Sequence, residues 1–299
     1  MPDAANARDH LTRFLLPRAG VRGVHVHLGE TWRAIASSDD YPPGVRALLG
    51  EAAAASALFT GHVKVDGRLS VQLRGQHGLR TLFAECTSEG TLRGIARLAE
   101  GSNDVDGLGS LGEDALLAIT IEGAGIGNRE ATRYQGMVPL DAPDLGGAFE
   151  DYFTRSEQLP TRILLTAGAD HAVGLMLQKL PADAGDGDGW DRASALFSTL
   201  GAAELATTPA AELLHRLFHE ESPELVGGRP LAFGCSCSQG RVEAMLESLG
   251  RSEAEAALVG GVATVRCEFC GQAYQFDAAG INALFTADRR PMEAPPGLQ

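Results

Sequence analysis

Four of the chain's five cysteines lie between residues 235 and 270, and this crowding constrains the fold more than any other feature. They form two short pairs, Cys235-Ser236-Cys237 and Cys267-Glu268-Phe269-Cys270. Each pair can bind one metal ion from a tight turn, because the neighbouring glycines 234 and 271 permit close approach of the backbone. Four thiolates match the soft, tetrahedral coordination that Zn²⁺ prefers. The sequence therefore predicts one Zn²⁺ bound by Cys235, Cys237, Cys267 and Cys270.

The segment between the two cysteine pairs is predicted to be structured. Apolar residues form a helical stripe over 242–249, and 262–266 alternates as a strand. Ser252 and Glu255 have the spacing of a capping box, which predicts a further short helix. A unit of this size has a thin core, so a bound metal would supply much of its folding free energy. The spacing alone leaves two alternatives open. The site could be a permanent structural zinc site that stabilises a small domain, which is the more common case, or it could be a switch.

Charge and hydropathy exclude several classes of protein. The chain has a net charge of −14 over 299 residues, whereas a protein that binds nucleic acid needs a basic face. No apolar run approaches the ~20 residues that span a bilayer, and charged residues interrupt 1–18 where a signal peptide would be apolar. We therefore expect a cytoplasmic protein that binds neither nucleic acid nor membranes. In that reducing compartment, closely spaced cysteines are typical of metal-binding or redox-active sites.

Residues 1–182 are predicted to form one large α+β domain with a mixed sheet. Ala-rich residues 45–61 predict a helix, and 145–155 a second one. Asp66-Gly67 predicts a hairpin turn between strands at 62–65 and 69–73. Helices and strands alternate without a regular βαβ rhythm, which favours α+β over a doubly wound sheet. Further strands are expected at 21–27, 79–84, 115–121, 132–139, 162–167 and 173–179.

Residues 183–230 are predicted to be a helical connector. The Gly- and Asp-rich run 183–189 is typical of a solvated hinge. Two short amphipathic helices should follow, one that Gly201 ends and one that Thr208-Pro209 starts. Helices this short need a packing partner, so the order of the connector depends on its neighbours. Residues 231–287 then form the small cysteine domain, and 288–299 are expected to be a disordered tail.

The two cysteine segments, CSCS at 235–238 and CEFCG at 267–271, resemble the redox-switch module of the 33 kDa heat-shock chaperonin family, the redox-regulated holdase chaperones of bacteria. The run EDYFTRSEQLPT at 150–161 resembles the same family and is highly specific. Five shorter segments extend the resemblance, in the right order, over nearly the whole chain: DDYP at 39–42, LRGIAR at 92–97, RYQG at 133–136, LMLQ at 175–178 and LFHEE at 217–221.

This resemblance implies a chaperone without catalytic turnover, and hence no enzyme. In the reduced state the four cysteines would bind zinc and the chaperone would be idle. Peroxide or hypochlorite would then form the disulfides Cys235–Cys237 and Cys267–Cys270, with release of zinc. The switch domain would unfold and the connector would loosen, exposing a surface for unfolding client proteins. The family also suggests dimerisation on activation and hand-off of clients to ATP-dependent chaperones. One departure is the hinge 183–189, which is richer in Gly and Asp than the family pattern and bears on the stability of the connector.

Two other classes of function stay open. The pair Cys267 and Cys270 has the spacing of a thiol–disulfide oxidoreductase, but such pairs normally precede a helix, and 272–276 alternates as a strand. The unit could also be a zinc-ribbon interaction module, although the net charge of −14 argues against nucleic acid as its partner.

Other motifs have simpler explanations. Gly107–Gly112 fits G-x-G-x-x-G but lacks the preceding strand of a dinucleotide site, so we expect a loop. His215 and His219 share a helix face, yet four thiolates suffice for one metal ion, so these are expected to be surface or packing residues. His25 and His27 alternate along a strand with no obvious partner.

Two further apolar features are expected to be buried. Cys86 stands alone and is expected to be a small buried hydrophobe. The second connector helix should pack on the domain in the idle state and could expose a client surface once freed, through Leu213, Leu214, Leu217 and Phe218.

Overall fold

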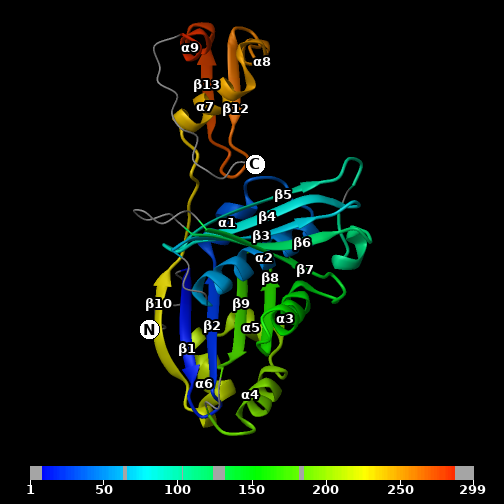
Figure 1. Ribbon diagram of the computed structural model, residues 1–299, viewed down its shortest axis with the longest axis vertical. Coiled ribbons are helices and arrows are strands. Elements are labelled where there is room, and N and C mark those ends of the chain that lie inside the picture. Colours follow the sequence, from blue (N-terminus) through cyan, green and yellow to red (C-terminus); the bar gives the residue numbers. More distant parts are fainter. Residues whose placement is uncertain (1–8, 63–65, 103, 124–131, 182–184, 287–299) are drawn as a thin grey trace. The chain divides into compact units, whose positions relative to one another are not determined.

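The computed structural model describes residues 9–62, 66–102, 104–123, 132–181 and 185–286. It divides into two compact units, Met1–Gly234 and Cys235–Gln299 (Figure 1). The expected tail at 288–299 lies outside the described residues. Within the described ranges, no helix combines the length and the apolar character needed to cross a membrane.

Two sheets form the framework of the first unit. The first sheet has the strand order β10-β1-β2-β9-β8 and is antiparallel throughout. Its strands are β1 (His10–Leu16), β2 (Val21–Leu28), β8 (Thr161–Ala167), β9 (Ala172–Lys179) and β10 (Glu224–Pro230). The second sheet has the order β11-β5-β4-β3-β6-β7, in which only the β11–β5 pair is parallel. Its strands are β3 (Gly67–Arg74), β4 (Leu79–Thr87), β5 (Thr91–Leu98), β6 (Leu116–Gly123), β7 (Thr132–Val138) and β11 (Ala232–Phe233).

Helix α2 (Pro43–His62) lies between these two sheets and contacts strands of both (Figure 1). A helix that is apolar on all sides is expected to be fully buried. Ala52, Ala53, Ala54 and Ala55 are completely buried, and their small side chains let both sheets approach the helix closely. The Ala-rich composition of α2 is therefore a consequence of its place in the middle of the core.

A layer of three short helices covers the other face of the first sheet. These are α4 (Gly189–Phe197), α5 (Ala202–Thr207) and α6 (Ala210–Phe218). Their apolar side chains form one cluster with Phe14, Val173 and Leu175 of the sheet. The Phe14 and Phe218 rings stack with their centroids 6.5 Å apart. The remaining helical elements are α1 (Glu30–Ala36), α3 (Leu145–Ser156), η2 (Leu108–Leu111) and η3 (His219–Glu221).

The second unit has a small core. Its elements are α7 (Gln239–Leu249), α8 (Arg251–Ala256), the antiparallel hairpin β12 (Val262–Arg266) and β13 (Ala273–Asp277), and α9 (Ala278–Leu284). Among its described residues, only seven buried apolar side chains make up the core: Val242, Leu246, Ala254, Ala263, Phe276, Ile281 and Leu284. Met245 and Leu249 belong to the predicted helical stripe but are exposed. So few buried side chains give the described part of this unit little hydrophobic stabilisation of its own.

The structure confirms the α+β class and corrects three local predictions. The hairpin at Asp66-Gly67 is wrong, because His62 ends α2 and β3 pairs instead with β4 and β6, while 63–65 lie outside the described residues. The connector has three helices rather than two, since α4 stops at Phe197 and Gly201 is the extended N-cap of α5. The capping box at Ser252 is also wrong, because the N-cap of α8 is Gly250, two residues before Ser252.

Glu51 of α2 is partly buried, and this predicts a pH-dependent stability. Burial, and to a lesser extent the charge of Asp144, raises the pKa of Glu51 to about 7. The folded protein therefore binds more protons than the unfolded chain between the ordinary carboxyl pKa and about pH 7, and stability falls as pH rises through this window. Glu51→Gln is expected to raise the free energy of unfolding by about 1–2 kcal/mol at pH 8.

At pH 4.5 the same substitution should change little, because Glu51 is then protonated in both states. Urea unfolding at the two pH values measures the difference. Glu30→Gln, at a side chain that is 77% exposed, is the matched control and should be neutral at both. An equal gain for Glu51→Gln at pH 4.5 and pH 8 would contradict the assignment.

Candidate metal centre

Two different local structures carry the four cysteines of the second unit. Cys235 and Cys237 lie in the extended segment that precedes α7. Ser238 starts this helix, because its side chain accepts a hydrogen bond from the Arg241 N–H at 3.3 Å. Both cysteines are therefore held next to a fixed helix start.

Cys267 and Cys270 lie in the turn that joins β12 to β13. The Cys267 N–H donates to the Gln272 carbonyl at 2.9 Å, and the Gly271 N–H donates to the Cys267 carbonyl at 2.8 Å. Gly271 has a φ of 71°, a left-handed conformation that favours glycine. This turn brings both thiols of the pair to the end of the hairpin, where their sulfur atoms lie close together.

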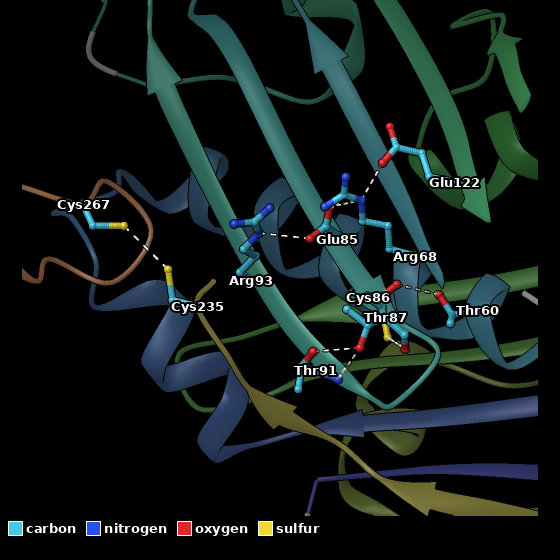
Figure 2. A network of polar contacts seen from close by, with 10 residues as sticks. All are labelled: Thr60, Arg68, Glu85, Cys86, Thr87, Thr91, Arg93, Glu122, Cys235 and Cys267. Atoms are coloured by element: carbon cyan, nitrogen blue, oxygen red, sulfur yellow. Dashed lines mark hydrogen bonds and ion pairs between the residues drawn. The ribbon is translucent and has the colours of Figure 1, made fainter. Parts of the chain in front are cut away.

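The four sulfur atoms form a single cluster and all lie within 4.8 Å of one another. Cys235 Sγ is 3.6 Å from Cys267 Sγ, a contact drawn in Figure 2, and Cys237 Sγ is 3.4 Å from Cys270 Sγ. In a tetrahedral site with metal–sulfur bonds of about 2.3 Å, neighbouring sulfurs are about 3.8 Å apart. The predicted ligands are thus brought together at the size of a four-thiolate centre, and they could hold a metal ion.

The pKa values of three of these thiols are shifted. Burial raises the pKa of Cys235 to about 12 and also raises the pKa of Cys270. A hydrogen bond from Tyr274 instead lowers the pKa of Cys237 to about 7. Four ionised thiolates at such short distances would repel one another unless a cation lay among them. Metal binding should therefore displace protons and be favoured as pH rises.

Tyr274 is a site residue that the sequence reasoning treated only as part of a strand. Its hydroxyl donates a hydrogen bond to Cys237 Sγ at 3.1 Å. Its place four residues beyond Cys270, in a strand leaving the cysteine turn, was the only available signal. Hydrogen bonds of this kind orient a ligand and stabilise its ionised form.

Tyr274→Phe is expected to weaken metal affinity about tenfold, because it removes this hydrogen bond and keeps the ring. Competition with a zinc chelator measures the change in Kd. Tyr134→Phe in the first unit is the matched control and should leave the affinity unchanged. An unaltered Kd for Tyr274→Phe would show that the hydrogen bond does not support the thiolate.

The other candidate residues do not join this centre. Cys86 is completely buried, as expected, and burial raises its pKa to about 11. His215 is exposed on α6 and His219 is exposed at the start of η3, which confirms them as surface residues. His25 is buried in β2, and burial lowers its pKa to about 3. The glycine motif at 107–112 forms the short helix η2 and its two flanking residues, with no strand directly before it.

A ladder of charged side chains crosses the second sheet near Cys86 (Figure 2). Arg93 contacts Glu85 at 3.0 Å, Glu85 contacts Arg68 at 3.6 Å, and Arg68 contacts Glu122 at 2.5 Å. These pairs join β5, β4, β3 and β6 in turn, so opposite charges lie on adjacent strands. Cross-strand pairs of this kind help to fix register.

An α+β unit joined to a small unit with a four-cysteine cluster defines a class of two-unit protein that could hold a metal ion. Comparison with known proteins narrows that class. The family model described as Hsp33 protein matches residues 9–277. A 33 kDa chaperonin from Nitrosococcus oceani is 42% identical over 285 residues, covering 94% of this chain and 96% of the relative. One from Neisseria meningitidis is 39% identical over 289 residues, covering 95% and 94%.

The chain belongs to the Hsp33 family. The fold agrees, since a crystal structure of a 33 kDa chaperonin from Thermotoga maritima superposes with a TM-score of 0.77. That comparison covers 93% of this chain and 97% of the other at 21% sequence identity, and it supports the fold alone.

Proposed function

We propose that this protein is a redox-regulated holdase chaperone, idle while reduced and zinc-bound and activated by disulfide formation with release of zinc. Membership of a family whose relatives are named 33 kDa chaperonin supports a chaperone function. The observation that carries the redox part is the cluster of four cysteine sulfurs, all within 4.8 Å, in a unit with a very small core. Removing those ligands should unfold that unit.

The connector supplies the second element of the switch. Its helices α4–α6 are held by an apolar cluster in which Leu213, Leu214 and Phe218 are nearly inaccessible. Arg192 of α4 also binds the buried Glu221 through two contacts, of 2.8 and 3.0 Å. These short helices are ordered by packing, so losing that packing would expose a large apolar surface. We propose that this surface, once released, binds unfolding client proteins.

The chemistry requires only the thiolates and an oxidant. Each disulfide removes two electrons from a cysteine pair, and one peroxide accepts them and is reduced to water. Four thiolates thus consume two peroxide molecules, and no ligand remains for zinc. We propose the pairs Cys235–Cys237 and Cys267–Cys270, which follow from the family resemblance. The sulfur contacts of 3.6 and 3.4 Å in the reduced cluster join different pairs, Cys235 with Cys267 and Cys237 with Cys270. Peptide mapping of the oxidised protein therefore tests the pairing directly.

The central experiment follows zinc release and chaperone activity together. The reduced, zinc-loaded protein is treated with peroxide under mild heating, and a chromogenic chelator reports zinc while light scattering reports aggregation of a client. We expect zinc release and suppression of aggregation to rise in parallel. Zinc release without protection of the client would overturn the switch. Full protection by the reduced, metal-bound protein would leave a chaperone but remove its redox control.

Two separate assays address the rival functions. A thiol–disulfide oxidoreductase would reduce a disulfide substrate catalytically, and a zinc-ribbon interaction module would bind a partner while reduced.

We further propose a cytoplasmic location, dimerisation of the active form and hand-off of clients to ATP-dependent chaperones. Sedimentation of the oxidised protein tests dimerisation.

A further inference from the structure

A cavity of about 470 Å³ in the first unit gathers positive charge in a chain whose net charge is −14. It lies where α2 ends and is lined by β1, β2 and β10 together with Ser88, which follows β4. Three arginines line it, one from each strand: Arg13, Arg22 and Arg229. The described residues that line this cavity include no aspartate or glutamate.

The strand register explains why these arginines meet. Arg22 pairs with Leu15, and Arg229 pairs with Leu11, so with Arg13 they share the face of the first sheet that α2 covers. Along α2 this face is apolar, but the helix stops at His62 and leaves room for longer, charged side chains. The cavity is thus a product of the helix length.

The arginines are only partly satisfied by the protein. Arg22 Nη2 lies 2.6 Å from Gln178 Oε1 and 2.8 Å from His62 Nε2, and Arg229 Nη1 donates to the Ser88 carbonyl at 2.7 Å. The Nε atoms of Arg22 and Arg229 are buried with no hydrogen-bond partner among the described residues. Arg13 is exposed, and its side chain forms no hydrogen bond or ion pair with any described residue. Guanidinium groups with unsatisfied donors in a cavity create a strong attraction for an anion.

The pKa of His62, which lines the cavity, is affected by the same positive charge. Burial, and then the charge of Arg22, lowers the pKa of His62 to about 4, so this histidine is neutral. The carbonyl end of α2 contributes roughly half a negative charge, which offsets only a small part of three positive charges.

We propose that this cavity binds a phosphate-bearing organic molecule of mononucleotide size. Guanidinium groups match the terminal oxygens of a phosphate monoester, which can accept hydrogen bonds from several arginines at once. Leu11, Val24 and Val226 supply an apolar wall for the organic part. The volume falls within the range of small-molecule sites. Such a ligand would connect β10 to β1 and β2 and so hold the end of the connector on the sheet.

Titration calorimetry of the reduced, full-length protein with AMP tests the proposal. We expect one AMP per chain, with an affinity that falls as salt is added. Adenosine and inorganic phosphate should each bind at least about tenfold more weakly, because each lacks half of the recognised groups. Hydrogen exchange in β10 should slow when AMP is bound.

Arg13→Gln and Arg229→Gln should each weaken AMP binding about tenfold or more. Arg13 is exposed, so its replacement leaves the fold intact even if Arg229→Gln destabilises it. Arg80→Gln, at an exposed arginine of β4 outside the cavity, is the matched control and should bind like the wild type. No AMP binding, or equal affinity in the wild type and Arg13→Gln, would overturn the proposal. Equal affinity for AMP and inorganic phosphate would overturn the proposal that the cavity recognises the organic part of the ligand.

Discussion

Cys267→Ser is expected to abolish stoichiometric zinc binding and to unfold the second unit. A structural zinc site contributes about 10–16 kcal/mol of binding free energy, which in a metal-dependent fold is folding free energy. Replacing one of four thiolates should cost at least about 3 kcal/mol, or more than a hundredfold in Kd. A core of seven apolar residues cannot offset that loss.

Zinc content after dialysis and limited proteolysis of residues 235–286 measure the two effects. Cys86→Ala is the matched control, because Cys86 lies in the first unit and far from the cluster in sequence. It should retain one zinc ion and a protease-resistant second unit. A Cys267→Ser protein with one tightly bound zinc ion and wild-type resistance would show that the cluster does not hold the unit together.

Phe218→Ala is expected to make the reduced, zinc-loaded protein active as a chaperone. Phe218 is completely buried and stacks on Phe14, so truncating it should cost about 3–5 kcal/mol of packing free energy. That cost falls on α6, a short helix whose order comes from packing rather than from its own propensity. The connector should then loosen without oxidation.

Suppression of client aggregation by the reduced protein measures this effect, with zinc content checked in parallel. Phe218→Leu keeps most of the buried volume and should stay close to the idle wild type. Hydrogen exchange of α6 shows whether the connector has loosened. A protein with rapid exchange in α6, bound zinc and no chaperone activity would separate connector loosening from client binding.

The elements that the sequence predicted well are those whose pattern is local. The Ala-rich run of α2, the alternation in β9 and the cysteine spacing each specify their structure within a short window. The four cysteines of the cluster were also predictable, because thiol chemistry and spacing suffice to name them. Their distances were not, since they depend on how α7 meets the β12–β13 hairpin.

The elements that were missed depend on distant partners. β10 is rich in glycine and mostly exposed, so its sequence has little strand character, and it forms only by pairing with β1. Gly201 was predicted to end a helix but is the N-cap of α5. The start of α5 at this point depends on its packing against β8 and β9. The arginine cavity could likewise not be predicted from the sequence, because Arg22 and Arg229 are far apart in the chain.

The pairing of β1 with β10 also has a consequence for how the chain is made. The first described strand pairs along one edge with residues 224–230, so the first sheet is complete only after most of the chain has been synthesised. Contacts of such long sequence separation form late, and an unpaired strand edge favours association with other chains until they do. On the ribosome, the β1 edge of the nascent chain stays open until translation has passed Pro230.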